Sequence, residues 1–171
     1  FNVLPINMHG HEGLGRVIQI GDNVCDVEVG DFVATRGEPA YADMYNVRPY
    51  EYVKVPEASP KYIIEPVACG INIINQSISE ISRVSYRNMA AGKRTKVLFL
   101  GSGFLAWVAY NYLKRDPLSL RCDVDVVGNN NHKIWKGILI PAIPVDTYDI
   151  IIDLGGDAEI FNQDIYNPGA L

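Results

Sequence analysis

Cysteine is scarce in this sequence. The 171 residues include three cysteines, Cys25, Cys69 and Cys122, which stand far apart and form no CxxC pair. An odd number of widely spaced cysteines argues against a disulfide framework and is typical of a protein from a reducing compartment. We therefore expect a cytoplasmic protein.

A basic excess and long apolar runs are also missing. The first 62 residues carry 5 basic and 9 acidic side chains and the remainder 10 and 11, so neither part suits a nucleic-acid partner. No apolar run approaches the roughly 18 residues that a membrane-spanning helix needs, so we expect no membrane partner. The sequence begins at Phe1 and not at Met, and we expect it to be a fragment of a longer protein.

The hydropathy pattern changes near residue 62. Before it, short alternating runs between Gly-Asp turns are typical of a small β-barrel or sandwich. They predict strands over 16–20, 24–29, 32–35 and 50–55. After it, the sequence predicts helices over 63–75, 77–92 and 104–115 and strands over 97–100, 123–127 and 148–154. The second helix is expected to begin at a capping box, Ser77 to Glu80.

Alternation of strands and helices after residue 62 predicts a parallel sheet. The fold class is therefore α/β. We expect a partial β-barrel domain over 1–62 and a nucleotide-binding domain over 63–171 that is incomplete at its C-terminal end.

The most informative motif is Gly101-Ser102-Gly103-Phe104-Leu105-Ala106, which matches G-x-G-x-x-G/A. The first glycine permits a tight turn, the second lets a pyrophosphate approach the backbone, and the third small residue lets the helix pack on the strand. Because an apolar strand precedes the motif and a helix follows it, we predict a dinucleotide site. The alternative is a purely structural glycine turn.

The next strand ends in Gly128 and Asn129 without a carboxylate. An NAD enzyme usually has Asp or Glu at this position to bind the ribose hydroxyls. The neutral residues and Lys133 would tolerate a 2′-phosphate, which favours NADP over NAD, unless the asparagines simply form a turn.

A second motif, Gly10-His11-Glu12-x-x-Gly15, places a histidine and a glutamate among glycines. Such a pair can supply a metal ligand and a supporting carboxylate, although a histidine in such a turn is more often structural. With Gly21 and the run 29–33 that follow, the motif resembles the signature of the zinc-type medium-chain alcohol dehydrogenase/reductase family. Segments 64–70, 97–106 and 148–156 resemble further parts of the same family, and the resemblance spans nearly the whole chain.

The resemblance implies a GroES-like barrel followed by a Rossmann domain. It also implies an NAD(P)-dependent oxidoreductase that moves hydride between nicotinamide and a small alcohol or carbonyl substrate. His11 and Glu65 match zinc ligands of the family, Glu12 matches the adjacent carboxylate, and these three are the implied catalytic residues. Gly155 lies in the segment that matches the loop passing the nicotinamide.

The chain departs from the family at its metal sites. The cysteine motif that precedes Gly-His-Glu and the four-cysteine lobe that follows Gly-Asp-x-Val are both missing, and Cys69 is a second choice as a ligand. Two alternatives therefore stay open: a zinc-independent reductase, and a catalytically degenerate nucleotide-binding or structural module. Since the family's pairing strand would follow Leu171, an open sheet edge would recruit a partner, and we expect a homodimer.

Overall fold

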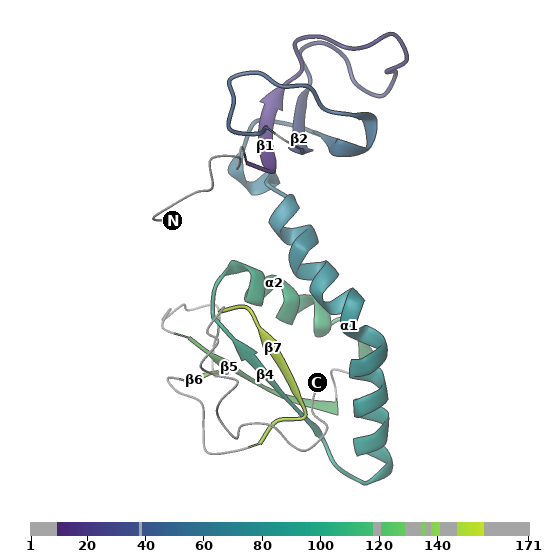
Figure 1. Ribbon diagram of the computed structural model, residues 1–171, viewed down its shortest axis with the longest axis vertical. Coiled ribbons are helices and arrows are strands. Elements are labelled where there is room, and N and C mark those ends of the chain that lie inside the picture. The colour runs from purple at the N-terminus through teal and green to yellow at the C-terminus, as the bar shows by residue number, and fades with distance from the viewer. Residues whose placement is uncertain are drawn as a thin grey trace. The chain divides into compact units, whose positions relative to one another are not determined.

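The computed structural model describes residues 10–37, 39–117, 121–128, 135, 138–140 and 147–155 (Figure 1). The chain forms two compact units, Phe1–Ala68 and Cys69–Leu171. Helix α1 (Glu65–Ala90) crosses from one to the other. The domain boundary expected between residues 62 and 63 stays a prediction. Among the described residues, no helix has the length and apolar character to cross a bilayer.

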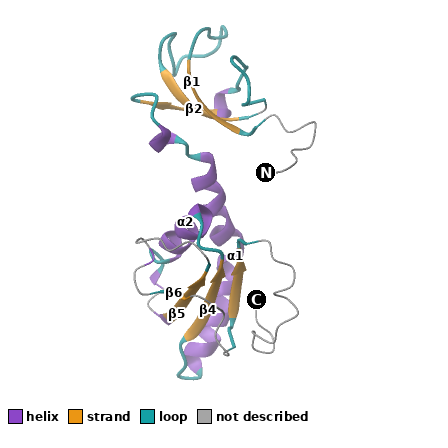
Figure 2. Cartoon of the chain, turned by 90° about the vertical axis from the view of Figure 1, so that its left-hand side faces the viewer, coloured by secondary structure: helices purple, strands orange, loops and turns teal. Residues whose placement is uncertain are grey.

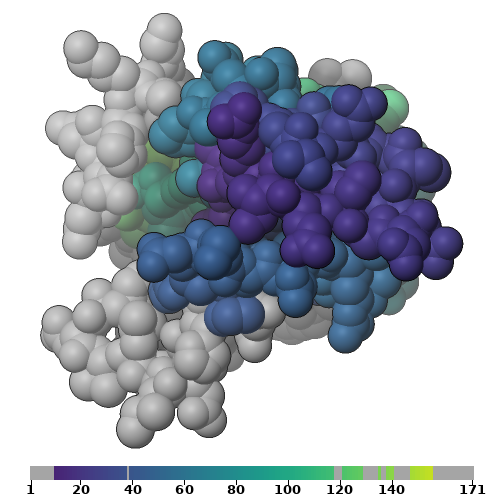
Figure 3. All heavy atoms as spheres, turned by 90° about the horizontal axis from the view of Figure 1, so that it is seen from above, coloured from purple at the N-terminus to yellow at the C-terminus, as the bar shows by residue number. Residues whose placement is uncertain are grey.

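The first unit contains an antiparallel sheet of three strands in the order β1-β2-β3. The strands are β1 (Glu12–Arg16), β2 (Phe32–Arg36) and β3 (Tyr52–Val55). The unit also contains two short 3-10 helices, η1 (Pro49–Glu51) before β3 and η2 (Pro60–Tyr62) after it. Atoms of this unit are the purple and blue spheres in Figure 3.

Two strand predictions in this unit were wrong. The first strand ends at Arg16 and does not begin there, and residues 24–29 form no strand, with a bend at Asp26 and a turn that begins at Val29. The first prediction failed because glycine is typical of turns, yet Gly13 lies inside β1. A Cβ on Gly13 would lie 2.1 Å from the Tyr45 hydroxyl. That hydroxyl makes a 2.5 Å hydrogen bond with Thr35 Oγ1, so the missing side chain is what lets Tyr45 pack on the sheet. In the second case only Val27 is buried, too little to hold a strand.

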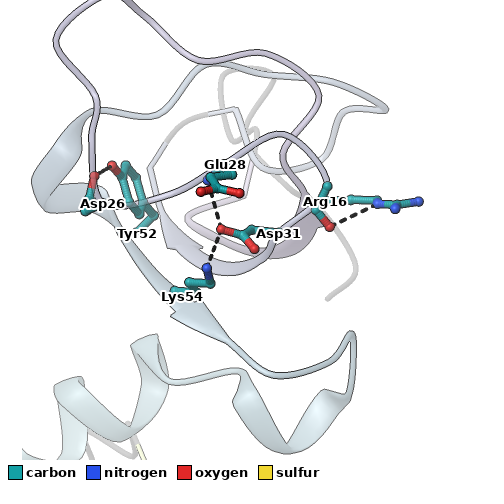
Figure 4. A network of polar contacts seen from close by, with 7 residues as sticks. Arg16, Asp26, Glu28, Asp31, Tyr52 and Lys54 are labelled. Carbon is teal, nitrogen blue, oxygen red and sulfur yellow. Dashed lines mark hydrogen bonds and ion pairs between the residues drawn. The ribbon is translucent and has the colours of Figure 1, made fainter.

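Polar contacts attach the loop between β1 and β2 to the sheet (Figure 4). Asp31 Oδ2 accepts the backbone N–H of Glu28 at 2.8 Å and pairs with Lys54 Nζ on β3 at 2.6 Å. Arg16 Nε donates to the carbonyl oxygen of Gly30 at 3.1 Å. Together these contacts hold both ends of the last turn of the loop.

Tyr52 is expected to titrate above the usual range of tyrosine. Its hydroxyl donates to Asp26 Oδ1 at 2.6 Å, and this bond raises the pKa of Tyr52 to about 12 (Figure 4). The bond therefore stabilises the folded chain below pH ~10, the ordinary tyrosine value, and the contribution is lost as the pH rises through about 12. NMR titration of 13C-tyrosine should show the Tyr52 resonance moving with a midpoint near pH 12. Asp26→Asn should return it toward pH ~10, and an unchanged titration would contradict the assignment.

The second unit contains a parallel sheet in the order β6-β5-β4-β7 (Figures 1 and 2). In addition to most of α1, the unit contains the following elements: β4 (Thr95–Leu100), α2 (Phe104–Leu113), β5 (Cys122–Val127), β6 (Leu139–Ile140) and β7 (Ile150–Asp153). This arrangement confirms the α/β class, with the parallel sheet in the expected place.

Helix α1 is continuous, so the expected start at Ser77 was wrong. The helix buries one face at a helical spacing that runs on past this position. The residues of this buried face are Gly70, Ile74, Ile81, Val84, Ser85 and Asn88. Ser77 is exposed, although its spacing from Ile74 and Ile81 places it on the same face as these two residues. Burial of Ile74 and Ile81 on either side of Ser77 outweighs its preference for a cap. The expected end was right, because Gly92 follows the helix with a φ of +70°.

Helices α1 and α2 pack on the same face of the sheet. Contacts with β4 and with α1 together hold α2 in place. Val97 and Phe99 of β4 lie in the same core cluster as Ile81 of α1 and Ala109 of α2. The two helices also approach closely, because a Cβ on Gly70 would lie 2.7 Å from Val108 Cγ1. The position of α2 relative to β4 is thus set on two sides.

A buried polar network should contribute measurably to the stability of this unit. Asn88 Nδ2 on α1 donates to Asp149 Oδ2 at 2.9 Å, and the same oxygen accepts the N–H of Lys96 at 3.0 Å. Asn88→Ala removes one donor from a buried carboxylate and should lower the free energy of unfolding by about 1–3 kcal/mol. Urea denaturation followed by the fluorescence of Trp107 and Trp135, both in this unit, measures it. Asn72→Ala, on the exposed side of the same helix, should change it little, and equal effects would contradict the prediction.

Candidate functional site

The glycine motif lies where the strand order of the parallel sheet reverses. From β4 the chain proceeds to β5 and β6 on one side, and β7 then pairs with β4 on the other side. In open α/β sheets, ligands bind at this switch point, outside the carboxyl ends of the strands. Residues 101–106 follow the carboxyl end of β4 directly, so the predicted dinucleotide loop occupies the position where such a site is expected.

Gly101 makes the tight turn that the motif requires. Its φ is +101°, and a Cβ would lie 3.2 Å from the carbonyl oxygen of Leu154 and from the nitrogen of Gly155. Its N–H donates to the carbonyl oxygen of Val127 at 2.8 Å, and Leu154 N–H donates to Leu100 O at 2.8 Å. The turn is therefore fastened to both neighbouring strands, which brings Gly155 beside Gly101.

Gly103 stands at the N-terminus of α2 with open space beside it. It is the N-cap residue, with φ −77° and ψ −172°, and no side chain caps the first turn of the helix. A Cβ on Gly103 would meet no atom of the described residues within 4 Å. Since the first N–H groups of a helix have no partner inside the helix, an anion could approach them through this space. The third small residue of the motif, Ala106, is buried against the core as expected.

Gly128 packs against the middle of the motif. A Cβ at this position would lie 2.2 Å from Ser102 Oγ and 2.8 Å from Ser102 N. Ser102 itself is buried. The carboxyl end of β5 thus supports the glycine turn directly, a role that the sequence did not indicate. Asn129 and Lys133, which carried the inference for NADP, lie outside the described residues.

The N–H of Gly155 is already used within the protein. It donates to Asp153 Oδ1 at 2.8 Å, in the turn that ends β7. Gly155 therefore serves the candidate site through its small size next to Gly101, while its N–H is directed to Asp153. Asp153, the last residue of β7, therefore lies at the same edge of the sheet as the glycine turn. No motif in the sequence predicted a role for it.

The first turn of α2 is unusually apolar for an exposed surface. Phe104 is 54% exposed and its ring stacks on Trp107, with centroids 6.4 Å apart. Leu105 is 37% exposed. These side chains can contact the planar rings of a nucleotide or substrate, in keeping with the predicted cofactor contacts at both positions.

The first unit brings Glu12 within range of the charges of both His11 and Glu65. Burial raises the pKa of the Glu12 carboxyl, the negative charge of Glu65 raises it further, and His11 opposes this shift. The Oε2 atom of Glu12 is buried and has no hydrogen-bond partner among the described residues. A carboxyl in this state keeps its proton to a higher pH than usual and can exchange it with a neighbouring polar group.

This cluster does not form a metal centre by itself. In the part of the chain that the structure describes, no three His, Cys, Asp or Glu side chains are grouped so that they could hold a metal ion. A catalytic zinc ion requires three protein ligands in its tetrahedral shell. The described residues therefore do not fit a zinc site, because none of them adds a third ligand to the predicted ligands His11 and Glu65. Cys69 is exposed on α1.

Comparison with known proteins supports the fold. No family model matches the chain. A curated protein of Leishmania amazonensis, described as a "Probable quinone oxidoreductase", is 32% identical over 89 residues, which are 52% of this chain and 26% of that protein. The crystal structure of glucose dehydrogenase from Haloferax mediterranei matches with a TM-score of 0.62 and 16% identity, over 94% of this chain and 58% of that one.

A second solved structure is similar. It is the CurF ER cyclopropanase from the curacin A biosynthetic pathway, with a TM-score of 0.54 and 20% identity, over 94% of this chain and 51% of that one. At these identities the two solved structures show the fold alone. The fold is the predicted one, a GroES-like unit followed by a Rossmann unit. The chain spans about a quarter of the curated relative's length and little more than half of the length of the two solved structures.

Proposed function

We propose that this chain belongs to an NAD(P)-dependent oxidoreductase of the medium-chain type. The observation that carries the proposal is the open space beside Gly103, at the uncapped N-terminus of α2 and at the switch point of the sheet. The described residues of this turn fit a pyrophosphate, because close approach to the backbone is unobstructed there. When bound, a nicotinamide would supply hydride chemistry that side chains cannot.

The proposed substrate is a small alcohol or carbonyl compound. The similarity to a protein described as a quinone oxidoreductase adds quinones, which are conjugated dicarbonyls, to the candidates. Within this proposal His11, Glu12 and Glu65 act on the substrate. The support is the buried Oε2 atom of Glu12, which no described residue hydrogen-bonds, and the raised pKa of that carboxyl. Both suit a group that gives or takes the proton of the substrate oxygen.

The preferred cofactor is proposed to be NADP. The residue that follows β5 is Gly128, and no carboxylate follows it up to residue 133, so nothing in this segment repels a 2′-phosphate. NAD is the second choice, since the glycine turn itself contacts only the part that both cofactors share.

Calorimetric titration of the full chain with NADPH and then with NADH tests the proposal. Saturable binding of either nucleotide is the expected result, with NADPH the tighter. A screen of alcohols, aldehydes and quinones for a change in NADPH absorbance then identifies the substrate class. Absence of binding to both nucleotides would refute the proposal and favour a degenerate module of the same fold.

A further inference from the structure

Trp135 makes a contact with the glycine turn that no pattern in the sequence predicts. The indole Nε1–H donates to the carbonyl oxygen of Ser102 at 3.0 Å, across 33 residues of chain, in a buried bond. Trp135 is 1% exposed and belongs to the same core cluster as α1 and α2. Its ring contacts Tyr110 of α2, with centroids 5.6 Å apart. The indole is therefore fixed by packing, and its donor is aimed at one peptide group.

This bond determines how the peptide between Ser102 and Gly103 is oriented. In a planar trans peptide the C=O and the following N–H point in opposite directions. Because Trp135 binds the Ser102 carbonyl within the core, the Gly103 N–H is directed away from the indole. The same glycine has open space beside its Cα and begins the uncapped first turn of α2.

The opposite orientation of this peptide would harm anion binding. A flipped peptide would present the Ser102 carbonyl oxygen, a partial negative charge, in place of an N–H. Without the indole donor, the inward orientation would leave a buried carbonyl without this partner, which is costly. The indole N–H therefore favours the orientation that suits a phosphate.

We propose that Trp135 is a positioning residue of the dinucleotide site: it holds the Ser102 carbonyl so that the Gly103 N–H faces the pyrophosphate. This inference rests on the proposed function. It goes beyond it by assigning to a core tryptophan, outside the glycine motif, control over one particular hydrogen bond to the cofactor. Trp135 touches the turn and is not itself expected to touch the nucleotide.

The test removes the indole N–H and keeps the ring. Site-specific replacement of Trp135 by benzothienylalanine exchanges the N–H for a sulfur atom of similar shape, and Trp135→Phe is a simpler second variant. Affinities for three ligands are measured by calorimetry on the full chain: NADPH, ADP and adenosine 2′-monophosphate. The first two contain a pyrophosphate and the third does not. Tyr86→Phe, a change in an exposed aromatic side chain of α1, is the control.

The expected result is a selective loss. Both Trp135 variants should bind NADPH and ADP about 10-fold more weakly, the value of one hydrogen bond to a charged group, and bind adenosine 2′-monophosphate as before. In 15N NMR spectra, the Gly103 amide shift that ADP induces in the unsubstituted chain should shrink in the benzothienylalanine variant. A merely structural role would weaken all three ligands alike.

Three results would overturn the proposal. Unchanged affinity of the benzothienylalanine variant for ADP would show that the N–H has no influence on the site. Equal losses for all three ligands, or an unchanged Gly103 amide shift, would assign Trp135 to packing alone. Failure of the unsubstituted chain to bind any of the three ligands would instead refute the proposed function, and this inference with it.

Discussion

Gly103→Ala is expected to weaken NADPH binding about 100-fold while the chain stays folded. The new Cβ meets no atom of the described residues within 4 Å, so we expect it to extend into the space proposed for the pyrophosphate. Displacing the phosphate would break two charge-assisted hydrogen bonds, about 3 kcal/mol in total, which corresponds to about 100-fold in affinity. The φ of −77° and ψ of −172° suit any residue, so stability should change by less than about 1 kcal/mol.

A matched control separates this effect from a general effect of alanine. A Cβ on Gly15 of β1 would likewise meet no atom within 4 Å, and Gly15 lies in the other unit. Gly15→Ala should therefore leave NADPH affinity unchanged, and thermal denaturation should show both variants folded. If Gly103→Ala bound NADPH as tightly as the unsubstituted chain, the pyrophosphate would not lie beside Gly103.

Gly128→Ala is expected to be the most destabilising of the glycine substitutions at the site. Its Cβ would lie 2.2 Å from Ser102 Oγ and 2.8 Å from the backbone nitrogen of Ser102, so both a buried side chain and the main chain must move. Overpacking of this kind costs about 1–3 kcal/mol, and contact with the main chain places this case at the upper end. Urea denaturation followed by tryptophan fluorescence measures the loss.

A second substitution tests whether Ser102 is the obstacle. Ser102→Gly removes the Oγ and Cβ atoms that the new methyl group would meet, so it should recover part of the lost stability in the double variant. The expected coupling is at least about 1 kcal/mol in a double-mutant cycle with Ser102→Gly alone. Strict additivity of the two substitutions would show that Gly128 and Ser102 do not pack on each other.

The glycine turn could be predicted from the sequence because its signals are local. An apolar run, a G-x-G-x-x-A motif and an apolar helix follow one another within about twenty residues, and the structure has β4, the turn and α2 in that order. Similarly, β2 and β3 appear where runs of β-branched and aromatic residues predict strands. In each case the residues that decide the structure are neighbours along the chain.

Other features depend on partners that are distant in sequence, and local patterns misjudged them. Ser77 has the signature of a helix start, yet core contacts of Ile74 and Ile81 on either side of it keep α1 continuous. Gly13 is tolerated in β1 because Tyr45 fills the space. Trp135 supports Ser102 from 33 residues away, and its own surroundings in the sequence give no hint of this bond.

The central place of β4 in its sheet has a consequence for biosynthesis. Val97 is aligned with Val124 on one side and with Ile150 on the other, and both partners follow it in the chain. A ribosome thus releases a strand that ends in four apolar residues before either neighbour exists, and parallel pairing cannot begin with a local hairpin. During this interval the nascent chain exposes a segment prone to aggregation, and α1, which precedes β4, is the first described element that can cover it.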